Sequence, residues 1–375
     1  MTLARLYGRL LTQSSQSVVT EGFRSVLEKE GLLAGVFGVD VSNLEDDDSA
    51  LDGANARHGI FTGPMEHLHQ MFEQGRHEFY WIMLAPNSNL LPDRLVKQIQ
   101  QIQGYERRFR GTQNQVRLIA PSRWAANVVA EQIPGAMVMS VPHGVSPEYT
   151  ESPFIADTMR VMYREGEFRV LHFSTSAQAR KGTFELIRDW MEIDQRPKGW
   201  FLACVLDYSA KIALHEKLLD EAVKIDASVS LCDRGDLLPA QCAWALSTAH
   251  VVCQPSRGEA FGLIPLQALC TGVPVVATMA TGHSEYLTHA TAGLEAVYVP
   301  YPANPQASYH MGPLDDLPGS IAPVLNTGEV GKALKSAHAR FIELQAAARQ
   351  AAPALRKEWS WQNQLQHFVN ELRRL

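Results

Sequence analysis

The sequence that decides the fold is V-V-C-Q-P-S-R-G-E-A-F-G-L-I-P-L-Q-A-L-C-T-G-V-P-V-V-A-T, residues 251–278. Residues 251–253 form a short apolar run that is typical of a buried parallel strand. The apolar residues of 261–270 recur at helical spacing, and the Gly and Pro that follow end this predicted helix. Residues 275–278 predict the next strand. A strand, a loop, a helix and a strand in this order indicate an α/β fold with a parallel sheet.

The loop before this helix combines an exposed helix start with a carboxylate. The first amide N–H groups of a helix have no partner inside it, and Gly258 and Gly262 have no side chain to keep a ligand away from them. These amides and the positive end of the helix dipole favour an anion such as phosphate. Glu259 repels phosphate but hydrogen-bonds hydroxyl groups strongly. A nucleotide sugar, which joins a diphosphate to a hydroxyl-rich group, suits both features.

The pattern P-S-x-x-E-A-F-G-L-x-P-L-Q-A-x-x-x-G-x-P-V-V-A-T resembles the donor-site signature of family 4 glycosyltransferases of the GT-B fold. In that family a first glutamate contacts the sugar hydroxyls and a second holds the ribose. The resemblance gives the first role to Glu259. The second position is Gln267 here, which still hydrogen-bonds a hydroxyl but carries no charge. This departure bears on nucleotide affinity more than on the type of reaction.

Further segments extend the resemblance to the rest of the donor site. The Arg-Lys-Gly that ends at Gly182 resembles the element whose cations grip the diphosphate. Many relatives have an arginine at the position of Ser176, so Arg180 is expected to be the second cation. The resemblance implies catalytic roles for Glu259, Lys181 and Arg180, and donor contacts for Gln267, Ala260, Phe261, Gly262, Leu263, Arg234, Gly282, His283 and Ser15.

The first half of the chain predicts a second domain of the same kind, with strands over 4–11, 32–41, 79–84, 116–120 and 137–141. Ser15 lies in a polar loop after the first of these strands, where it either faces a ligand or caps the following helix. Asn87, His143 and Arg107 are assigned to the acceptor side. His143 is alternatively a simple turn residue, and the Arg107 patch is alternatively a solvated helix end.

The length of 375 residues predicts two domains. The resemblance implies an α/β GT-B fold, in which two Rossmann-like, doubly wound domains face a central cleft. The acceptor-side domain is expected over 1–150 and the donor domain over 151–355. A helix over 356–375 is expected to cross back to the first domain, and one long helix is expected over 329–352. The apolar face of the last helix is formed by Trp361, Leu365, Phe368, Leu372 and Leu375.

The composition argues against nucleic-acid-binding, disulfide-rich, secreted and membrane-spanning proteins. The 34 Lys and Arg against 40 Asp and Glu give a net charge of −6, which argues against general attraction to nucleic acid. The five cysteines are odd in number and form no C-x-x-C pair, so buried free thiols in a reducing compartment are expected. Arg5 and Arg9 interrupt the apolar N-terminus, so it predicts no signal peptide. No apolar run is long enough to span a membrane, and a cytoplasmic location is expected.

The resemblance implies a retaining hexosyltransferase that moves a sugar from a UDP- or GDP-linked donor to a hydroxyl acceptor. It implies no bound metal and no permanent cofactor. A DNA-modifying glycosyltransferase acting on a hydroxymethylated base is an alternative, for which the basic patch at 107–110 leaves room. A GT-B epimerase or phosphorylase, or an inactive nucleotide-sugar-binding protein marked by Gln267 and Ser176, are the others.

Overall fold

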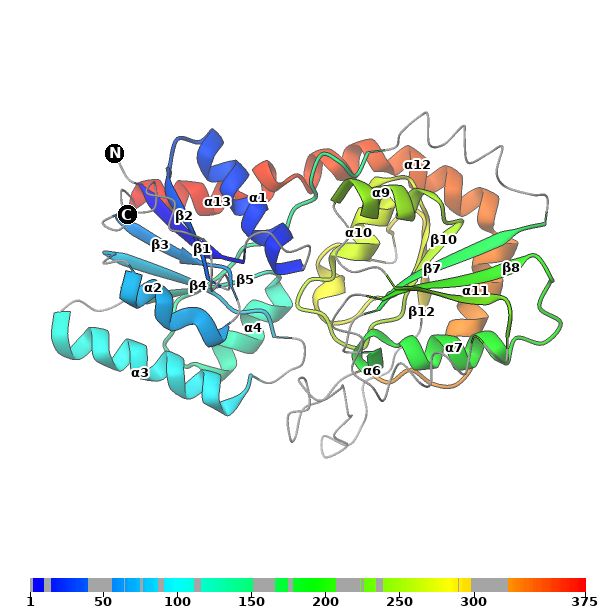
Figure 1. Ribbon diagram of the computed structural model, residues 1–375, viewed down its shortest axis with the longest axis horizontal. Helices are drawn as coiled ribbons and strands as arrows, with labels where there is room; N and C mark the ends of the chain where they lie inside the picture. The colour runs from blue at the N-terminus through cyan, green and yellow to red at the C-terminus, as the bar shows by residue number, and fades with distance from the viewer. Residues whose placement is uncertain are drawn as a thin grey trace. The chain divides into compact units, whose positions relative to one another are not determined.

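The computed structural model describes residues 3–9, 15–39, 56–63, 65–74, 77–86, 91–110, 116–150, 166–174, 178–206, 223, 226–233, 239–288, 290–297 and 323–375. The chain divides into two compact units. Unit 1 comprises Met1–Pro86, Leu90–Ser146 and Trp359–Leu375, and unit 2 comprises Asn87–Asn89 and Pro147–Glu358. Each unit is built on one six-stranded sheet (Figure 1).

The sheet of unit 1 is parallel, with the strand order β2-β1-β3-β4-β5-β6. Its strands are β1 (Ala4–Gly8), β2 (Leu33–Gly38), β3 (His58–Phe61), β4 (Phe79–Met83), β5 (Val116–Ala120) and β6 (Val138–Ser140). Its helices are α1 (Ser15–Lys29), η2 (Met65–His67), α2 (Leu68–Gln74), α3 (Asp93–Arg110), α4 (Arg123–Gln132) and α13 (Trp361–Arg374).

Alternation along the strands gives this sheet two buried faces. Successive side chains of a strand point to opposite faces, so Trp81 and Tyr80 of β4 belong to different cores. Trp81 packs with residues of α1 and α13. Tyr80 packs with residues of α2, α3 and α4. Figure 1 shows these two groups of helices on opposite sides of the sheet.

The start of α13 is seated between two glycines of unit 1. A Cβ atom on Gly22 of α1 would lie less than 3.0 Å from the indole ring of Trp361. A Cβ atom on Gly144 would lie equally close to the backbone of the same residue. Only the absence of both side chains lets α13 approach this closely.

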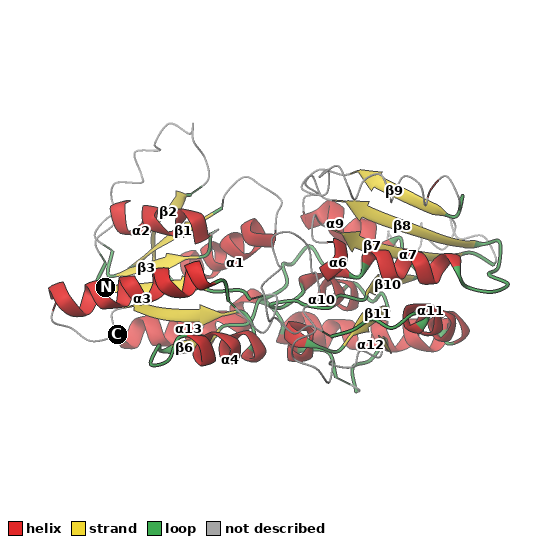
Figure 2. Ribbon diagram, turned by 90° about the horizontal axis from the view of Figure 1, so that it is seen from below, coloured by secondary structure: helices red, strands yellow, loops and turns green. Residues whose placement is uncertain are grey.

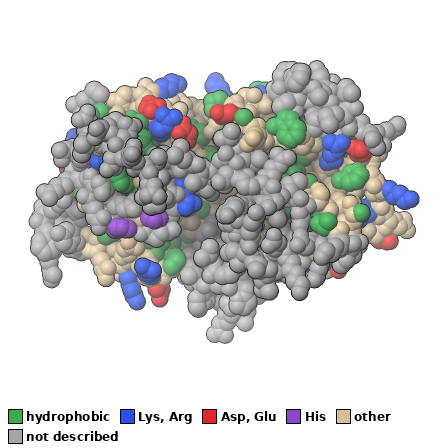
Figure 3. All heavy atoms as spheres, viewed as in Figure 1, with side chains coloured by type: hydrophobic (Ala, Val, Ile, Leu, Met, Phe, Trp, Pro, Cys, Tyr) green, Lys and Arg blue, Asp and Glu red, His purple; other side chains and the backbone are tan. Residues whose placement is uncertain are grey.

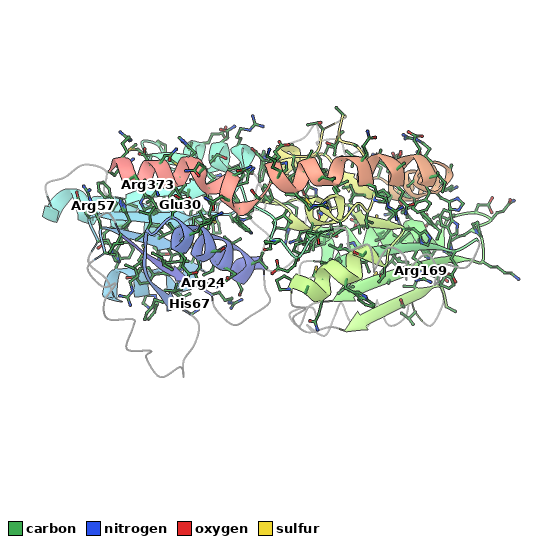
Figure 4. All side chains as sticks on the ribbon, turned by 90° about the horizontal axis from the view of Figure 1, so that it is seen from above. Arg24, Glu30, Arg57, His67, Arg169 and Arg373 are labelled. Carbon is green, nitrogen blue, oxygen red and sulfur yellow. The ribbon has the colours of Figure 1, made fainter. Side chains whose placement is uncertain are left out.

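Polar contacts hold both ends of α13 on unit 1. Just before the helix, the carbonyl of Trp359 accepts a 2.7 Å hydrogen bond from the N–H of Val145. Within the helix start, Ser360 is the N-cap, and its hydroxyl accepts a hydrogen bond from the amide of Asn363 at 3.3 Å. Near the other end, Arg373 forms a 2.7 Å ion pair with Glu30, which follows α1 (Figure 4). The predicted return of the last helix to the first half of the chain is therefore confirmed.

The sheet of unit 2 is also parallel, with the strand order β12-β11-β10-β7-β8-β9. Its strands are β7 (Phe168–Ser174), β8 (Trp200–Leu206), β9 (Val229–Asp233), β10 (Val251–Gln254), β11 (Val275–Thr278) and β12 (Leu294–Val297). Its helices are α6 (Gln178–Lys181), α7 (Thr183–Met191), α9 (Pro239–Ser247), α10 (Leu263–Cys270), η4 (Thr281–Glu285), α11 (Glu329–Ala339) and α12 (Phe341–Glu358). Figure 2 shows helices on both sides of this sheet.

Three elements differ from the sequence prediction. Strands β3 and β12 were not predicted, because each has four residues and a pattern diluted by Gly or Glu. The single helix expected over 329–352 is two helices, which meet at Arg340, the C-cap of α11. The second helix continues through Pro353 to Glu358.

Charges of both signs lie on one face of the described surface (Figure 3). On the face drawn in Figure 3, Lys and Arg side chains are interspersed with Asp and Glu side chains. Among the described residues, no helix has the length and apolar character needed to cross a bilayer. Cys204, Cys242, Cys253 and Cys270 are buried free thiols, as predicted.

Candidate functional site

The loop between β10 and α10 presents unpaired backbone donors. Gly262 is the N-cap of α10 and has a φ of 81°, a left-handed conformation that glycine adopts without strain. The helix begins at Leu263, slightly later than the apolar spacing suggests. The amide N–H groups of Gly262, Leu263 and Ile264 have no acceptor among the described residues. These N–H groups can therefore bind an anion, as the sequence predicts.

Beside these amides, Glu259 forms ion pairs with both predicted cations. Its Oε1 atom accepts a 2.6 Å hydrogen bond from Lys181 Nζ. Its Oε2 atom lies 3.1 Å from Arg180 Nη1, which also donates to the carbonyl of Gly258 at 2.7 Å. The three side chains are only 8%, 13% and 10% exposed, in the order Glu259, Lys181, Arg180. The structure thus brings the three predicted catalytic residues together in one buried cluster.

The topology of unit 2 explains why residues so distant in sequence meet. Strands β7 and β10 are neighbours in the sheet, and their carboxyl ends lie at the same edge. The α6 cations follow β7, and the Glu259 loop follows β10. A backbone hydrogen bond of 2.7 Å from Arg257 to Arg180 joins the two segments. Gly182, with a φ of 70°, is needed here, because a Cβ atom would lie less than 3.0 Å from the carbonyl of Pro255.

The charge state of Glu259 follows from its partners. Burial alone raises the pKa of this carboxyl group, but the nearby charges of Lys181 and Arg180 outweigh burial and hold the pKa below its usual range. The group is therefore an anion over the whole physiological range. An ionised carboxylate accepts hydrogen bonds from hydroxyl groups, and the two cations can hold phosphate oxygens.

The backbone of Glu259 is anchored by the loop after β11. Its N–H donates to the hydroxyl of Thr281 at 3.0 Å, and its carbonyl accepts from the N–H of Gly282 at 2.7 Å. The sequence predicts that the Gly282 amide faces the donor. In the structure this N–H is hydrogen-bonded to the carbonyl of Glu259 instead. Gly282 therefore holds the Glu259 loop in place through this group and does not offer it to a ligand.

His283 lies behind the helix start as a neutral side chain. Its Nδ1 atom is 3.1 Å from the carbonyl of Thr278, which can only accept, so Nδ1 carries the proton. Its Nε2 atom has no hydrogen-bond partner in the described structure and faces the open side of Gly262. Burial lowers the pKa of His283 to about 4. The residue packs the two loops together and is completely buried.

Three further predicted donor residues around α10, Ala260, Phe261 and Gln267, are buried, whereas Leu263 is half-buried. The ring of Phe261 lies 5.2 Å from that of Tyr286, whose hydroxyl donates to the carbonyl of Gly262. Gln267 is 3% exposed, and its amide makes no hydrogen bond to a described residue. The side-chain amide of Gln267 can therefore hydrogen-bond a ligand. Ala260 is 8% exposed and packs within the loop.

Sequence reasoning missed three side chains that shape this site. Thr281 and Tyr286 hold the loop as described above. Arg257 lies 3.7 Å from Glu185 of α7, and burial raises the pKa of that carboxyl group. Arg257 could have been suspected from the sequence because it lies two residues before Glu259 in the same loop. Its partner Glu185 could not, because it lies on α7, far from the loop in sequence.

The side chains of five other residues named in the sequence prediction are not described. Arg234, Asn87 and Ser176 lie outside the described residues. Ser15 is the first residue of α1 and Arg107 lies in α3, but their side chains are not described.

His143 lies against the start of α13. Its ring is 7% exposed and lies 5.7 Å from that of Trp361, and burial lowers the pKa of His143 to about 3. Its assignment to the acceptor side stays a prediction. In the described part of the chain, no three His, Cys, Asp or Glu side chains gather as a metal site would need.

Comparisons with known proteins agree with this arrangement. Residues 238–368, which include the Glu259 loop, α10 and η4, match a family model described as "Family 4 Glycosyltransferase in conflict systems". The lipopolysaccharide 1,2-N-acetylglucosaminetransferase of Salmonella typhimurium is 24% identical over 268 residues. That alignment covers 69% of this chain and 62% of the relative, so the chain spans less than two thirds of the relative's length.

Solved structures with the same architecture span the whole chain. HepE of Anabaena, solved with UDP and glucose, has a TM-score of 0.68 at 15% identity, with 100% of both chains covered. Sucrose-phosphate synthase of Thermosynechococcus elongatus has a TM-score of 0.70 at 13% identity, over 100% of this chain and 99% of the other. The two-domain α/β GT-B fold is confirmed. So is the resemblance to family 4-like glycosyltransferases.

Proposed function

We propose that this chain is a glycosyltransferase that moves a hexose from a UDP- or GDP-linked donor to a hydroxyl acceptor. The observation that carries the proposal is the buried cluster of Glu259, Lys181 and Arg180 beside the first amides of α10, which have no acceptor in the described part of the chain. A diphosphate needs cations and N–H donors, and a sugar needs a hydrogen-bond acceptor. The cluster supplies both within one loop pair. HepE, a structural neighbour of this chain, has been solved with UDP-glucose.

Each residue then has a distinct role. Lys181 and Arg180 stabilise the charge that develops on the departing diphosphate, together with the amides of Gly262 and Leu263. Glu259 orients the sugar hydroxyls. Gln267 holds the ribose through its available amide. We assign these roles to unit 2 and the acceptor to unit 1.

Retention of the anomeric configuration without a metal is part of the same proposal. No side chain of the cluster is placed as a general base, because Glu259 is held by two cations. The leaving phosphate is then the group that accepts the proton of the acceptor hydroxyl. Product anomers identified by NMR, with the reaction run in excess chelator, test both points.

Turnover of nucleotide sugars by the Lys181→Ala variant tests the activity. Wild-type protein is incubated with UDP- and GDP-linked hexoses, with and without candidate acceptors, and released nucleoside diphosphate is measured. The variant is expected to fold and to lose about 3–4 kcal/mol of transition-state stabilisation, a hundred- to thousandfold fall in rate. Undiminished turnover by the variant contradicts the assignment.

Lys332→Ala is the matched control. Lys332 is an exposed lysine of the same unit that forms a 2.6 Å ion pair with Glu329 of the same helix. Its removal is expected to leave turnover unchanged. An epimerase is distinguished by conversion of the sugar nucleotide without release of nucleoside diphosphate, and an inactive binding protein by the absence of any turnover.

A further inference from the structure

The two cations of the candidate site are already covered by an anion of the protein itself. Arg180 and Lys181 contact the carboxylate of Glu259 at 3.1 and 2.6 Å, and both side chains are about nine-tenths buried. A phosphate that approaches them therefore meets a neutralised cation and a like charge. Like charges in a buried site repel strongly because little water screens them.

We propose that Glu259 competes with the donor phosphates for Lys181 and Arg180, and that this exchange makes the site prefer a sugar-linked nucleoside diphosphate over the free one. The proposal rests on the proposed function and adds a specificity role to one of its residues. Binding replaces the carboxylate of Glu259 with phosphate oxygens at Lys181 and Arg180.

The cost of this exchange depends on what the ligand offers the displaced carboxylate. A buried carboxylate without cations or hydrogen bonds is strongly unfavourable. A nucleotide sugar brings hydroxyl groups that donate to it. A free nucleoside diphosphate brings none at this position. Glu259 therefore opposes the free nucleotide more than the sugar-linked one.

The anchored backbone makes the exchange a movement of one side chain. The N–H and the carbonyl of Glu259 are both hydrogen-bonded to the loop after β11, at 3.0 and 2.7 Å. The carboxylate can turn from the cations to the sugar while the loop stays in place. After the sugar has been transferred, the carboxylate of Glu259 returns to Lys181 and Arg180 and displaces the nucleotide product.

Isothermal titration calorimetry with matched ligands tests the exchange. UDP and UDP-glucose, and in parallel GDP and GDP-mannose, are titrated into wild-type protein, Glu259→Gln and Glu185→Gln. Glutamine keeps the shape and some hydrogen bonds of Glu259 but cannot neutralise the cations. The Glu259→Gln variant is expected to bind the free nucleoside diphosphate about tenfold more tightly than wild type, and the nucleotide sugar no more tightly.

Glu185→Gln is the control for a general change of charge. Glu185 is a largely buried acid of the same unit, and it forms an ion pair with Arg257 at 3.7 Å rather than with Lys181 or Arg180. Its removal is expected to leave the ratio of the two affinities unchanged. Equal tightening in both variants contradicts the exchange.

The remaining outcomes separate this proposal from the proposed function. If Glu259→Gln binds the free nucleotide no more tightly than wild type does, the exchange is overturned. The proposed function still stands in that case, provided that the wild-type protein binds both ligands. If neither wild type nor any variant binds a nucleotide, the proposed function itself is overturned. Should Glu259→Gln be destabilised, its thermal unfolding with and without UDP decides: a larger shift than in wild type is expected, and a smaller one counts against the exchange.

Discussion

At the scale of single residues, Gly262 shows how one position serves two purposes. The sequence predicts glycine there so that a ligand can approach the backbone. The structure adds that a Cβ atom at Gly262 would lie less than 3.0 Å from His283 and 3.3 Å from the side chain of Glu259. His283 lies beyond the next strand, so no local spacing could reveal this second reason. The residue type was predictable from the sequence, but its packing was not.

Replacing Gly262 with alanine is expected to destabilise unit 2 and weaken donor binding. The positive φ of 81° costs about 1–2 kcal/mol for an alanine, and the contact with His283 adds to that cost. Urea denaturation and titration with a nucleotide sugar measure both effects. Gly135→Ala is the matched control, because Gly135 has a φ of 79° and nothing within 4 Å of its Cβ position. Equal losses in the two variants argue against the packing role.

At the scale of elements, a neutral histidine joins three parts of unit 2. His172 of β7 has its Nδ1 atom 2.9 Å from the carbonyl of Cys253 in β10, so Nδ1 is the donor. Its Nε2 atom then accepts from the hydroxyl of Thr183, the first residue of α7, at 2.8 Å. Burial lowers the pKa of His172 to about 4. A protonated ring could not accept from Thr183 and would have to donate to its hydroxyl oxygen instead, so protonation reverses this hydrogen bond.

We expect this connection to weaken in acid. Between pH 6.5 and about 4 the unfolded chain binds a proton at His172 and the folded chain does not, so stability falls as the pH falls. One such proton corresponds to about 1.4 kcal/mol per pH unit. Denaturation of wild type and of His172→Asn at several pH values measures it. The variant is expected to be less stable at pH 7 but to lose less on acidification. Parallel profiles contradict the role of His172.

The elements also show where sequence patterns suffice. Strand β5 has the predicted bounds, 116–120, because it is an apolar run with turn residues at its end. Ser122 caps α4 through a 3.1 Å hydrogen bond, as its sequence position indicates. Strand β3 was missed because its sequence, His-Gly-Ile-Phe, has no clear strand pattern, and it is stabilised as a strand by its pairing with β1 and β4. Short strands are decided by their neighbours in the sheet.

At the scale of the whole molecule, the two units differ in how the chain builds them. Described residues of unit 2 come from one continuous stretch, 147–358, whereas unit 1 needs a final segment that starts at Trp359. That segment contributes Leu365, Phe368 and Leu372 to the unit 1 core, each at most 1% exposed. Burial of each such side chain contributes about 1.5–3 kcal/mol. Together they amount to much of the stability of an ordinary domain.

A fragment experiment follows from this difference. Residues 147–358 expressed alone are expected to fold, whereas residues 1–146 alone are expected to aggregate or stay unfolded. Addition of a peptide of residues 359–375 is expected to restore the fold of the 1–146 fragment, as measured by circular dichroism. The same peptide with Phe368→Ala serves as the control and is expected to restore it poorly. Stable folding of 1–146 without any peptide contradicts the expected role of α13.

The seat of Trp361 between Gly22 and Gly144 has a consequence for how this gene can diverge. The three codons lie far apart, yet a Cβ atom at position 22 would overlap the indole ring of Trp361, and one at position 144 would overlap the backbone of the same residue. A smaller residue at 361 relieves only the first overlap, so Gly22 can be replaced once residue 361 has shrunk, whereas Gly144 cannot. An alignment of descendants should therefore show positions 22 and 361 varying together while position 144 stays glycine.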